Sequence, residues 1–300
     1  MLESPLVSVC CITYNHEKYI ADCIRGFLNQ RTSFQVEFLI HDDASTDSTQ
    51  SIIRDLVGSD DRFKLILRTE NIKSTGAMVF HILVDIARGK YLAYCEGDDF
   101  WSDPHKLEKQ VALLESNEGK YVICAHKINE LNEFNGQERI FPIIEELSEY
   151  DVKDFIKENV VGTSSLVFRR EMGFPLYPAW SKGLVFGDWL LILNILENGK
   201  RPIVVIPEVM STYRINSTGI HGSARSSSDK LYRAYRLHLS FINTIQNYLL
   251  KDKHYVLPIL KKQIDTYVKL VSLGGSMPFR IRLKDILTLK VLQLKEIWYS

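Results

Sequence analysis

The sequence predicts an α/β protein in which a mostly parallel sheet is flanked by helices and followed by a helical extension. Two observations support this prediction. Over roughly the first hundred residues, short apolar runs alternate with helix-like segments across short connections, which is typical of right-handed βαβ units. Two of the apolar runs are followed directly by acidic clusters, and ligands bind at the carboxyl ends of strands in open α/β sheets.

The expected strands are short apolar runs bounded by turn residues. They span 7–13, 36–40, 63–67 and 91–95, and the helices between them span 20–28, 48–56 and 78–87. Ser45-Thr46-Asp47 can cap the helix from Ser48. Beyond residue 105 we expect a helix at 106–116, a strand at 121–125, a polar stretch to Tyr150, a strand at 164–168, a helix at 189–197 and a strand at 203–206.

Charge divides the chain into a domain at 1–221 and a basic helical extension at 222–300. The extension holds 14 Lys and Arg against 5 Asp and Glu, although the whole chain is neutral. A linker or loop at 223–228 precedes expected amphipathic helices at 231–250, 255–270 and 283–298. The basic extension suggests an anionic partner surface, membrane or nucleic acid, unless it is simply a solvated helical face.

The sequence predicts a cytoplasmic protein. Residues 1–5 lack the basic and apolar regions of a signal peptide, and no apolar run approaches the roughly 18 residues that a membrane span needs. The five cysteines form no CxxC pair, so we expect reduced core residues rather than disulfides or metal ligands.

The acidic clusters predict a site for a divalent cation and a ligand rich in hydrogen-bond donors. They are Asp42-Asp43-Ala44-Ser45-Thr46-Asp47 and Glu96-Gly97-Asp98-Asp99. Carboxylates crowded in one crevice repel each other unless a cation or donors satisfy them, and Mg²⁺ and Mn²⁺ prefer hard oxygen ligands. The first cluster could instead cap a helix, and the second could be a solvated loop. Tyr14, in a turn that is not glycine-rich, could stack on a base.

These motifs, together with Val7-Ser8-Val9 and Thr13-Tyr14-Asn15, resemble family 2 glycosyltransferases of the bacterial surface-polysaccharide type, which have the Rossmann-like GT-A fold. The resemblance implies an inverting enzyme that uses a nucleotide-activated sugar. It implies that Tyr14 and Asp43 hold a uracil, with Asp42 nearby. Glu96-Gly97-Asp98 takes the place of the family's Asp-x-Asp motif, with Asp98 on the metal and Asp99 beside it. Glu96 replaces the usual first Asp, which leaves its contact with ribose or metal open.

The resemblance also implies a base. Asp188 begins a helix within 185–190, where the family carries its catalytic acid. A helix N-terminus favours the ionised carboxylate, although Asp188 could equally be an N-cap. The Tyr-Arg segment at 211–214 leads to His221, which could join the metal or the diphosphate, although a lone loop histidine is usually neither. Lys73 or Arg214 could neutralise phosphate or form a surface ion pair, and 163–165 could line the acceptor side.

The resulting hypothesis is an inverting glycosyltransferase that moves a hexose-type sugar, with Asp188 as general base and Mn²⁺ or Mg²⁺ as cofactor. The expected partners are a nucleotide diphosphate sugar, with UDP favoured, and a glycan or lipid-linked acceptor, but no nucleic acid. A homo-oligomer stays open. The residues expected to bind donor and cofactor are Thr13, Tyr14, Glu17, Asp42, Asp43, Lys73, Glu96, Gly97 and Asp98, with Asp98, Asp99 and His221 on the metal.

Two alternatives were weighed against this hypothesis. A sugar-nucleotide pyrophosphorylase would want a glycine-rich basic loop after the first strand, which Thr13-Tyr14-Asn15-His16-Glu17 does not supply. A non-catalytic nucleotide-sugar-binding scaffold would tolerate the loss of Asp188 or Asp98, and both are present.

In the extension, Leu283, Ile286, Leu287 and Lys290 recur at helical spacing. This face could lie on the inner surface of the cell membrane, or pack on the catalytic domain or a second subunit.

Overall fold

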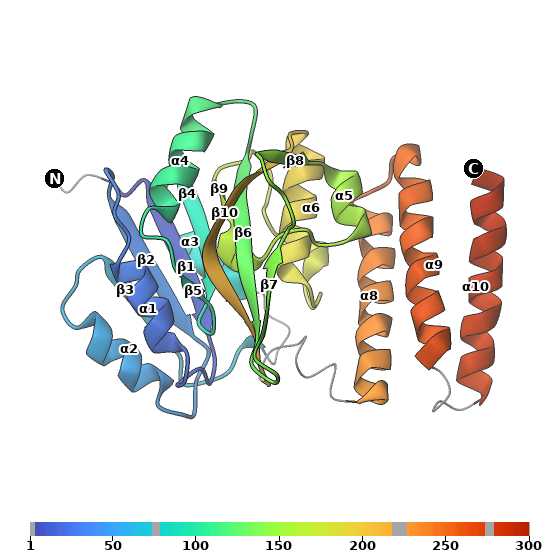
Figure 1. Ribbon diagram of the computed structural model, residues 1–300, viewed down its shortest axis with the longest axis horizontal. Helices are drawn as coiled ribbons and strands as arrows, with labels where there is room; N and C mark the ends of the chain where they lie inside the picture. The colour runs from blue at the N-terminus through green and yellow to red at the C-terminus, as the bar shows by residue number, and fades with distance from the viewer. Residues whose placement is uncertain (1–3, 74–78, 218–226, 274–278, 300) are drawn as a thin grey trace.

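A single mixed sheet organises the protein in the computed structural model, which describes residues 4–73, 79–217, 227–273 and 279–299, the side chains of 279–283 excepted. The strand order is β3-β2-β1-β4-β9-β6-β10-β5, with β7 beside β6 and β8 beside β10 (Figure 1). The strands are β1 Val7–Thr13, β2 Val36–Asp42, β3 Phe63–Leu67, β4 Tyr91–Glu96, β5 Phe100–Trp101, β6 Ile123–Asn132, β7 Gln137–Phe141, β8 Ser148–Tyr150, β9 Val167–Arg169 and β10 Ile203–Ile215.

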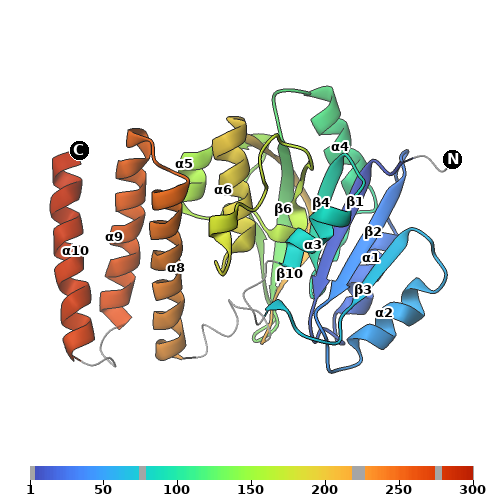
Figure 2. The same cartoon turned by 180° about the vertical axis from the view of Figure 1, so that it is seen from behind.

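The helices before residue 200 cover both faces of this sheet, and the later ones stack to one side of it (Figure 1). They are α1 Ile20–Leu28, α2 Thr49–Val57, α3 Val79–Ile86, α4 Lys106–Ser116, α5 Val152–Lys157, α6 Gly187–Gly199, α8 Ser228–Tyr248, α9 Val256–Leu273 and α10 Phe279–Tyr299, with a 3₁₀ turn η2 at Thr163–Ser165. One apolar core lies between the sheet and α1, α2 and α4. The other lies under α3, α5 and α6, on the face turned to the viewer in Figure 2.

Strands β3, β2, β1 and β4 run parallel, and β1 lies between β2 and β4. The chain adds β2 and β3 on one side of β1 and then crosses to the other side to add β4. This reversal is the topological switch point at which open α/β sheets bind ligands, beyond the carboxyl ends of the strands. The antiparallel β9 then joins the parallel half to β6 and β10. The expected α/β fold is confirmed.

The extension helices do not form a separate bundle. In α8, Phe241 packs against Trp189 of α6, with ring centroids 5.0 Å apart, and Ile259 of α9 belongs to the same core. In both views α10 is outermost, beside α9 (Figures 1 and 2). The domain boundary near residue 221 stays a prediction, because residues 218–226 lie outside the described ranges. Within the described residues, no helix has both the length and the apolar character needed to cross a bilayer.

Several sequence predictions need correction at the centre of the chain. The stretch to Tyr150, expected only to be polar, contains most of β6 and the whole of β7 and β8. The final strand extends past Ile206 to Ile215 through a register shift between Ile206 and Val209. In α10 the expected apolar face is only partly right, because Ile286 is half-buried while Leu287 is 55% exposed. All five cysteines are buried and unpaired, as predicted.

The first residue of α4 is a buried lysine. Lys106 is fully inaccessible, and its Nζ donates to Gln110 Oε1 at 2.8 Å and lies 4.1 Å from the centroid of the Trp101 ring. Burial lowers the pKa of Lys106 to about 7, because a charged ammonium loses its hydration in the core. We therefore expect Lys106 to lower the free energy of unfolding at neutral pH rather than to raise it.

Candidate active site

The two turns that follow β1 and β2 are bonded to each other. The backbone N–H of Asn15 donates to Ser45 Oγ at 2.8 Å, and Asn15 Oδ1 accepts from Thr46 N at 2.8 Å. Both turns contain a non-glycine residue in the left-handed region, Asn15 at φ 55° and Ala44 at φ 66°. Such backbone is costly and concentrates at functional sites. The turns therefore form one rigid platform, from which Tyr14 presents a side chain that is 42% exposed.

Two of the predicted donor-binding acids hold this platform together. Asp42 is fully buried, and its Oδ1 accepts from Ser45 N at 2.9 Å and from Gln50 Nε2 at 2.6 Å. Glu17 Oε2 accepts from Ser48 N at 3.0 Å, at the start of α2. The structure therefore gives Asp42 and Glu17 turn-stabilising contacts, and their contact with a donor stays a prediction.

Asp43 lies at the rim of the same platform. Its two carboxylate oxygens accept from Ile72 N and Lys73 N, each at 2.9 Å. Its own N–H donates to Thr13 O at 3.0 Å, which ties it to the end of β1. The carboxylate is thus held in one orientation before any ligand arrives. The side chain of Lys73 is exposed, and its charge acts on both Glu96 and His16.

The acidic turn after β4 packs tightly against the end of β1. A Cβ on Gly97 would lie 2.6 Å from Thr13 Oγ1 and 3.1 Å from His16 Nδ1, so only glycine fits without a shift. Gly97 N donates to Ile12 O at 2.9 Å. Thr13 was predicted to contact the ligand, and the structure places it under this turn.

The acids of this turn crowd one another. Burial, together with the adjacent Asp98 charge, raises the pKa of Glu96 to about 8. The same two causes raise the pKa of Asp99 well above its usual range. Asp98 Oδ2 accepts from Asn216 Nδ2 at 2.9 Å and lies 3.8 Å from His16 Nε2. Crowding of this kind indicates a site that favours a cation or a proton.

Arg214 braces the acidic turn from behind. Its backbone N–H donates to Asp99 Oδ1 at 2.9 Å, and its guanidinium donates to Asp98 O at 2.9 Å and to Asp22 Oδ2 at 2.7 Å. The guanidinium also lies 4.5 Å from the centroid of the Phe100 ring. Since it is committed to these contacts and only 9% exposed, Arg214 positions the turn rather than offering a free charge for phosphate.

Asp188, the predicted base, is the second residue of α6. The N-cap position of this helix is Phe186, which makes no side-chain cap, so Asp188 is not an N-cap. Its Oδ2 instead accepts from Asn159 Nδ2 at 2.9 Å and Thr163 Oγ1 at 3.2 Å. Oδ1 takes no hydrogen bond from the described part of the chain.

One tyrosine shows that Asp188 and the acidic turn share a single region. Burial raises the pKa of Tyr213, and the charges of Asp99, Glu96, Asp98 and Asp188 each raise it further. The Asp188 charge also raises the pKa of Glu96. Acids from β4, the β4–β5 turn and α6 therefore act on one another across the same site, although they are far apart in sequence.

The donor set is compatible with Mn²⁺ or Mg²⁺ once a phosphate ligand is included. Among the described residues, no group of three or more His, Cys, Asp or Glu side chains could hold a metal ion. Such ions need only one or two protein carboxylates when substrate phosphates supply further oxygens. The Asp98–Glu96 pair fits this requirement. Close to it are three buried polar atoms that have no hydrogen-bond partner among the described residues: Thr13 Oγ1, His16 Nδ1 and Asp99 Oδ2. His221 lies outside the described residues.

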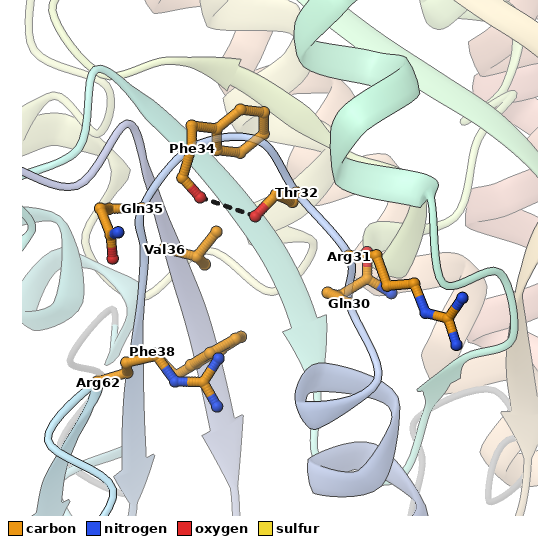
Figure 3. Close-up of a pocket in the computed structure, with 8 residues that line it drawn as sticks. All are labelled: Gln30, Arg31, Thr32, Phe34, Gln35, Val36, Phe38 and Arg62. Atoms are coloured by element: carbon orange, nitrogen blue, oxygen red, sulfur yellow. Dashed lines mark hydrogen bonds between the residues drawn. The ribbon is translucent and has the colours of Figure 1, made fainter.

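A hollow of about 290 Å³ lies at the opposite end of the strands (Figure 3). Gln30, Arg31, Phe34 and Arg62 line it, near the end of α1 and the start of β2. Figure 3 shows Arg31 and Arg62 on opposite sides of this hollow. It is remote from the acidic turns, so we place the candidate active site at the carboxyl ends of the strands.

Sequence reasoning missed several residues of this site. Asn159 and Asn216, which bind the carboxylates of Asp188 and Asp98, stand in no recognisable motif. His16 lay within a motif but was not singled out. Of the proposed acceptor segment, Ser164 and Ser165 are fully buried, and only Thr163 reaches Asp188.

The family model for glycosyl transferase family 2 matches residues 8–172, which is more than half of the chain. The match contains both acidic turns and η2. The chain therefore belongs to glycosyl transferase family 2.

Relatives by sequence agree with this family. An uncharacterised protein of Mycobacterium tuberculosis is 36% identical over 227 residues, which cover 75% of this chain and 63% of that protein. The chain thus spans less than two thirds of the mycobacterial relative. The putative teichuronic acid biosynthesis glycosyltransferase TuaG of Bacillus subtilis is 26% identical over 233 residues, covering 77% and 88% of the two chains.

Two solved structures share the fold. TarS of S. aureus in complex with UDP-GlcNAc superposes with a TM-score of 0.57 at 17% identity, covering 98% of this chain and 88% of that one. The mannosyltransferase PcManGT from Pyrobaculum calidifontis, with GDP-Man and Mn²⁺, gives 0.59 at 14% identity, covering 98% and 81%. The predicted GT-A fold is confirmed.

Proposed function

We propose that this glycosyltransferase moves a sugar from a nucleotide diphosphate sugar to an acceptor hydroxyl, with inversion at the anomeric carbon. The observation that carries the proposal is the position of Asp188. Two neutral donors fix its carboxylate, and its charge acts on Glu96 in the acidic turn. A proton acceptor and a cation-binding turn thus face one site, which is what direct displacement at a sugar carbon requires.

Donor recognition begins at the rigid platform. The exposed ring of Tyr14 can stack on a nucleotide base, and the preoriented Asp43 carboxylate can accept an N–H of uracil. UDP is the favoured nucleotide, in keeping with the UDP-GlcNAc complex of the structural neighbour TarS. The exposed side chain of Lys73, whose charge acts on Glu96, is proposed to attract the diphosphate.

Asp188 removes the acceptor proton. Asn159 and Thr163 both donate to its Oδ2, which orients the carboxylate and leaves Oδ1 for the acceptor O–H. As that hydroxyl attacks the anomeric carbon, the bond to the diphosphate breaks on the opposite face and Asp188 takes the proton. A single displacement converts an α-linked donor into a β-linked product.

Asp98, with Glu96 beside it, would hold Mn²⁺ or Mg²⁺. Such an ion stabilises the charge that develops on a leaving diphosphate. Asn216 and the Arg214 brace keep the Asp98 carboxylate and its backbone in place for this role. Asp99, whose Oδ1 already accepts from Arg214 N, is proposed as the neighbour that supports Asp98.

The acceptor is proposed to be a growing or lipid-linked surface glycan. TuaG, the relative from Bacillus subtilis, is named for teichuronic acid biosynthesis, and lipid-linked acceptors would be met at the inner face of the cell membrane. Residues 1–221 would form the catalytic domain and 222–300 the extension behind it.

Labelled nucleotide sugars tested singly with Mn²⁺ and mixed glycan acceptors provide the experiment. We expect release of nucleoside diphosphate, and a β-linked product by NMR from an α-linked donor. Pyrophosphate-dependent exchange of label would indicate a pyrophosphorylase instead, and donor binding without turnover would indicate a scaffold. The variant Asp188→Asn, which removes the proposed base, should lose this activity. Its control is Asp151→Asn, because Asp151 also lies at the start of a helix but serves there as the N-cap of α5.

A further inference from the structure

Helix α10 has two apolar faces, and only one of them is packed. On the packed face, Asp285 is 2% exposed and accepts from Tyr232 Oη at 2.6 Å and from the Arg236 guanidinium at 3.1 Å. Leu289 and Leu292 are half-buried on the same side. These contacts fix the rotation of α10 about its axis, and so determine which side chains face away from the protein.

The opposite face carries a stripe of large apolar side chains. Leu287, Val291, Leu294 and Trp298 are 55%, 52%, 68% and 81% exposed. Their spacing of four, three and four residues places them in one row along three turns of helix. Four such residues in a row are more than the scattered exposed hydrophobics of an ordinary surface. We call these four residues the outer stripe.

The charges beside the outer stripe are all positive. Lys284, Lys290 and Lys295 are exposed, and helical spacing puts them on the flanks of the stripe. The two acids among the described side chains of α10 are on the packed side: Asp285 is held by Tyr232 and Arg236, and Glu296 is half-buried. An apolar row edged only by cations matches a surface that is apolar inside and anionic outside.

We propose that the outer stripe docks on an anionic lipid surface, with the stripe at the level of the acyl boundary and the three lysines among the headgroups. Leucine and tryptophan on one face with lysines at its edges suit a helix lying in the membrane plane. A second copy of α10 would instead set lysines against lysines, which costs affinity. This inference does not rest on the donor chemistry and is tested without any donor.

The experiment is sedimentation of the full chain with vesicles of phosphatidylglycerol mixed with phosphatidylcholine, at low salt. We expect binding that weakens with salt and is lost on pure phosphatidylcholine. Lys284→Gln/Lys290→Gln/Lys295→Gln should weaken it roughly a hundredfold, since each cation near such a surface contributes about fivefold. Leu294→Ser/Trp298→Ser should weaken it at least tenfold. Both variants alter exposed side chains only, so their melting temperatures should match the parent.

Matched controls come from exposed positions outside the extension. Lys64→Gln/Lys153→Gln/Lys182→Gln removes the same charge from exposed positions outside the extension. Phe134→Ser/Ile143→Ser removes apolar side chains that are 60% and 86% exposed. We expect both control variants to bind vesicles as the parent does.

Three results would overturn the proposal. One is a parent chain that ignores anionic vesicles. The second is a control set that weakens binding as much as the α10 variants, which would show that net charge or general stickiness is responsible. The third is a dimer that forms with increasing protein concentration in light scattering and is lost in Leu294→Ser/Trp298→Ser, while vesicle binding is unchanged. This result would assign the outer stripe to contact with a second copy of the chain. Nucleoside diphosphate release should be the same in all variants when a soluble acceptor is used.

Discussion

A methyl group added to Gly97 tests whether the acidic turn must sit tightly on the end of β1. In Gly97→Ala the new Cβ would lie 2.7 Å from Thr13 Cβ and 2.6 Å from Thr13 Oγ1. Two carbon atoms in contact prefer about 3.5–4.0 Å, so the overlap is roughly 1 Å. Thr13 cannot retreat easily, because it pairs with Asp42 in the sheet and its carbonyl accepts from Asp43 N. The turn must therefore move, and Asp98 moves with it.

A displacement of this size should be far more damaging to activity than to folding. Misplacing a reacting group by about 1 Å can cost on the order of a hundredfold in rate, whereas overpacking typically costs about 1–3 kcal/mol of stability. We expect Gly97→Ala to remain folded and to release nucleoside diphosphate about a hundredfold more slowly. Steady-state kinetics at saturating Mn²⁺ and a thermal melt separate the two effects.

Gly199→Ala is the matched control. Gly199 is the last residue of α6, and a Cβ there would meet only Val122 Cγ2 at 3.8 Å, an ordinary contact. Alanine is a better helix former than glycine, so this variant should keep full activity and melt at the same or a higher temperature. The reasoning is refuted if Gly97→Ala works within threefold of the parent, or if Gly199→Ala loses as much activity.

Three further predictions address the acids and the buried lysine. Asp188→Asn should lower the rate about a hundredfold or more with donor affinity nearly unchanged; more than a tenth of parental activity would remove Asp188 as the base. Asp98→Ala should abolish turnover and the Mn²⁺ dependence of nucleotide binding measured by calorimetry, and an unchanged dependence would contradict the assignment. Lys106→Met should raise the melting temperature at pH 7 and below. The pKa of Lys106 is about 7 in the folded protein and 10.5 when the side chain is exposed, so between these pH values the unfolded chain binds one proton more than the folded chain. The rise in melting temperature should therefore shrink as the pH increases toward 10.5. A rise that does not depend on pH would argue against a buried charge.

The parallel half of the sheet was predictable because its signals are local. The bounds of β1 and α1 agree with the sequence prediction residue for residue, since β1 is a largely apolar run and the buried side of α1 recurs at helical spacing. Strands buried on both faces read as continuous apolar runs. The end of such a run also shows where the carboxyl end of the strand lies, and so where Asp43 and Asp98 would be found.

The second half was poorly predicted for two physical reasons. Nearly all of β7 is exposed, so it lacks the apolar pattern by which a strand is recognised. In β10, Pro207 and Glu208 interrupt the apolar run, and the strand continues only because a register shift after Ile206 accommodates them. Proline within a run usually argues against a central strand, and bulges that restore pairing are a tertiary feature.

The residues that bind the acidic side chains could not be predicted from the sequence for a different reason. Arg214 reaches Asp98 and Asp99 across more than a hundred residues, and Asn216 reaches Asp98 across a similar separation. An arginine after a tyrosine can be an ion pair, a phosphate ligand or a brace, and only the packing of β10 against β5 decides between them. The acids were identified because clustered charge is conspicuous, whereas their partners are ordinary residues made specific by position.

The type of support these acids receive explains why the site should need a cation with its donor. Asp98 and Asp188 are held by amide and hydroxyl donors, which orient a carboxylate without neutralising it. Arg214 directs its guanidinium to Asp22 and to the backbone oxygen of Asp98, so its charge is partly spent outside the site. Burial first, and then the repulsion of the adjacent Asp98 charge, raise the pKa of Glu96. A diphosphate approaching this turn adds further negative charge, and Coulomb repulsion at these distances is substantial in a partly buried site. Orientation by neutral groups therefore preserves a negative potential that would draw a divalent cation in, and such a cation would in turn make the turn acceptable to the donor.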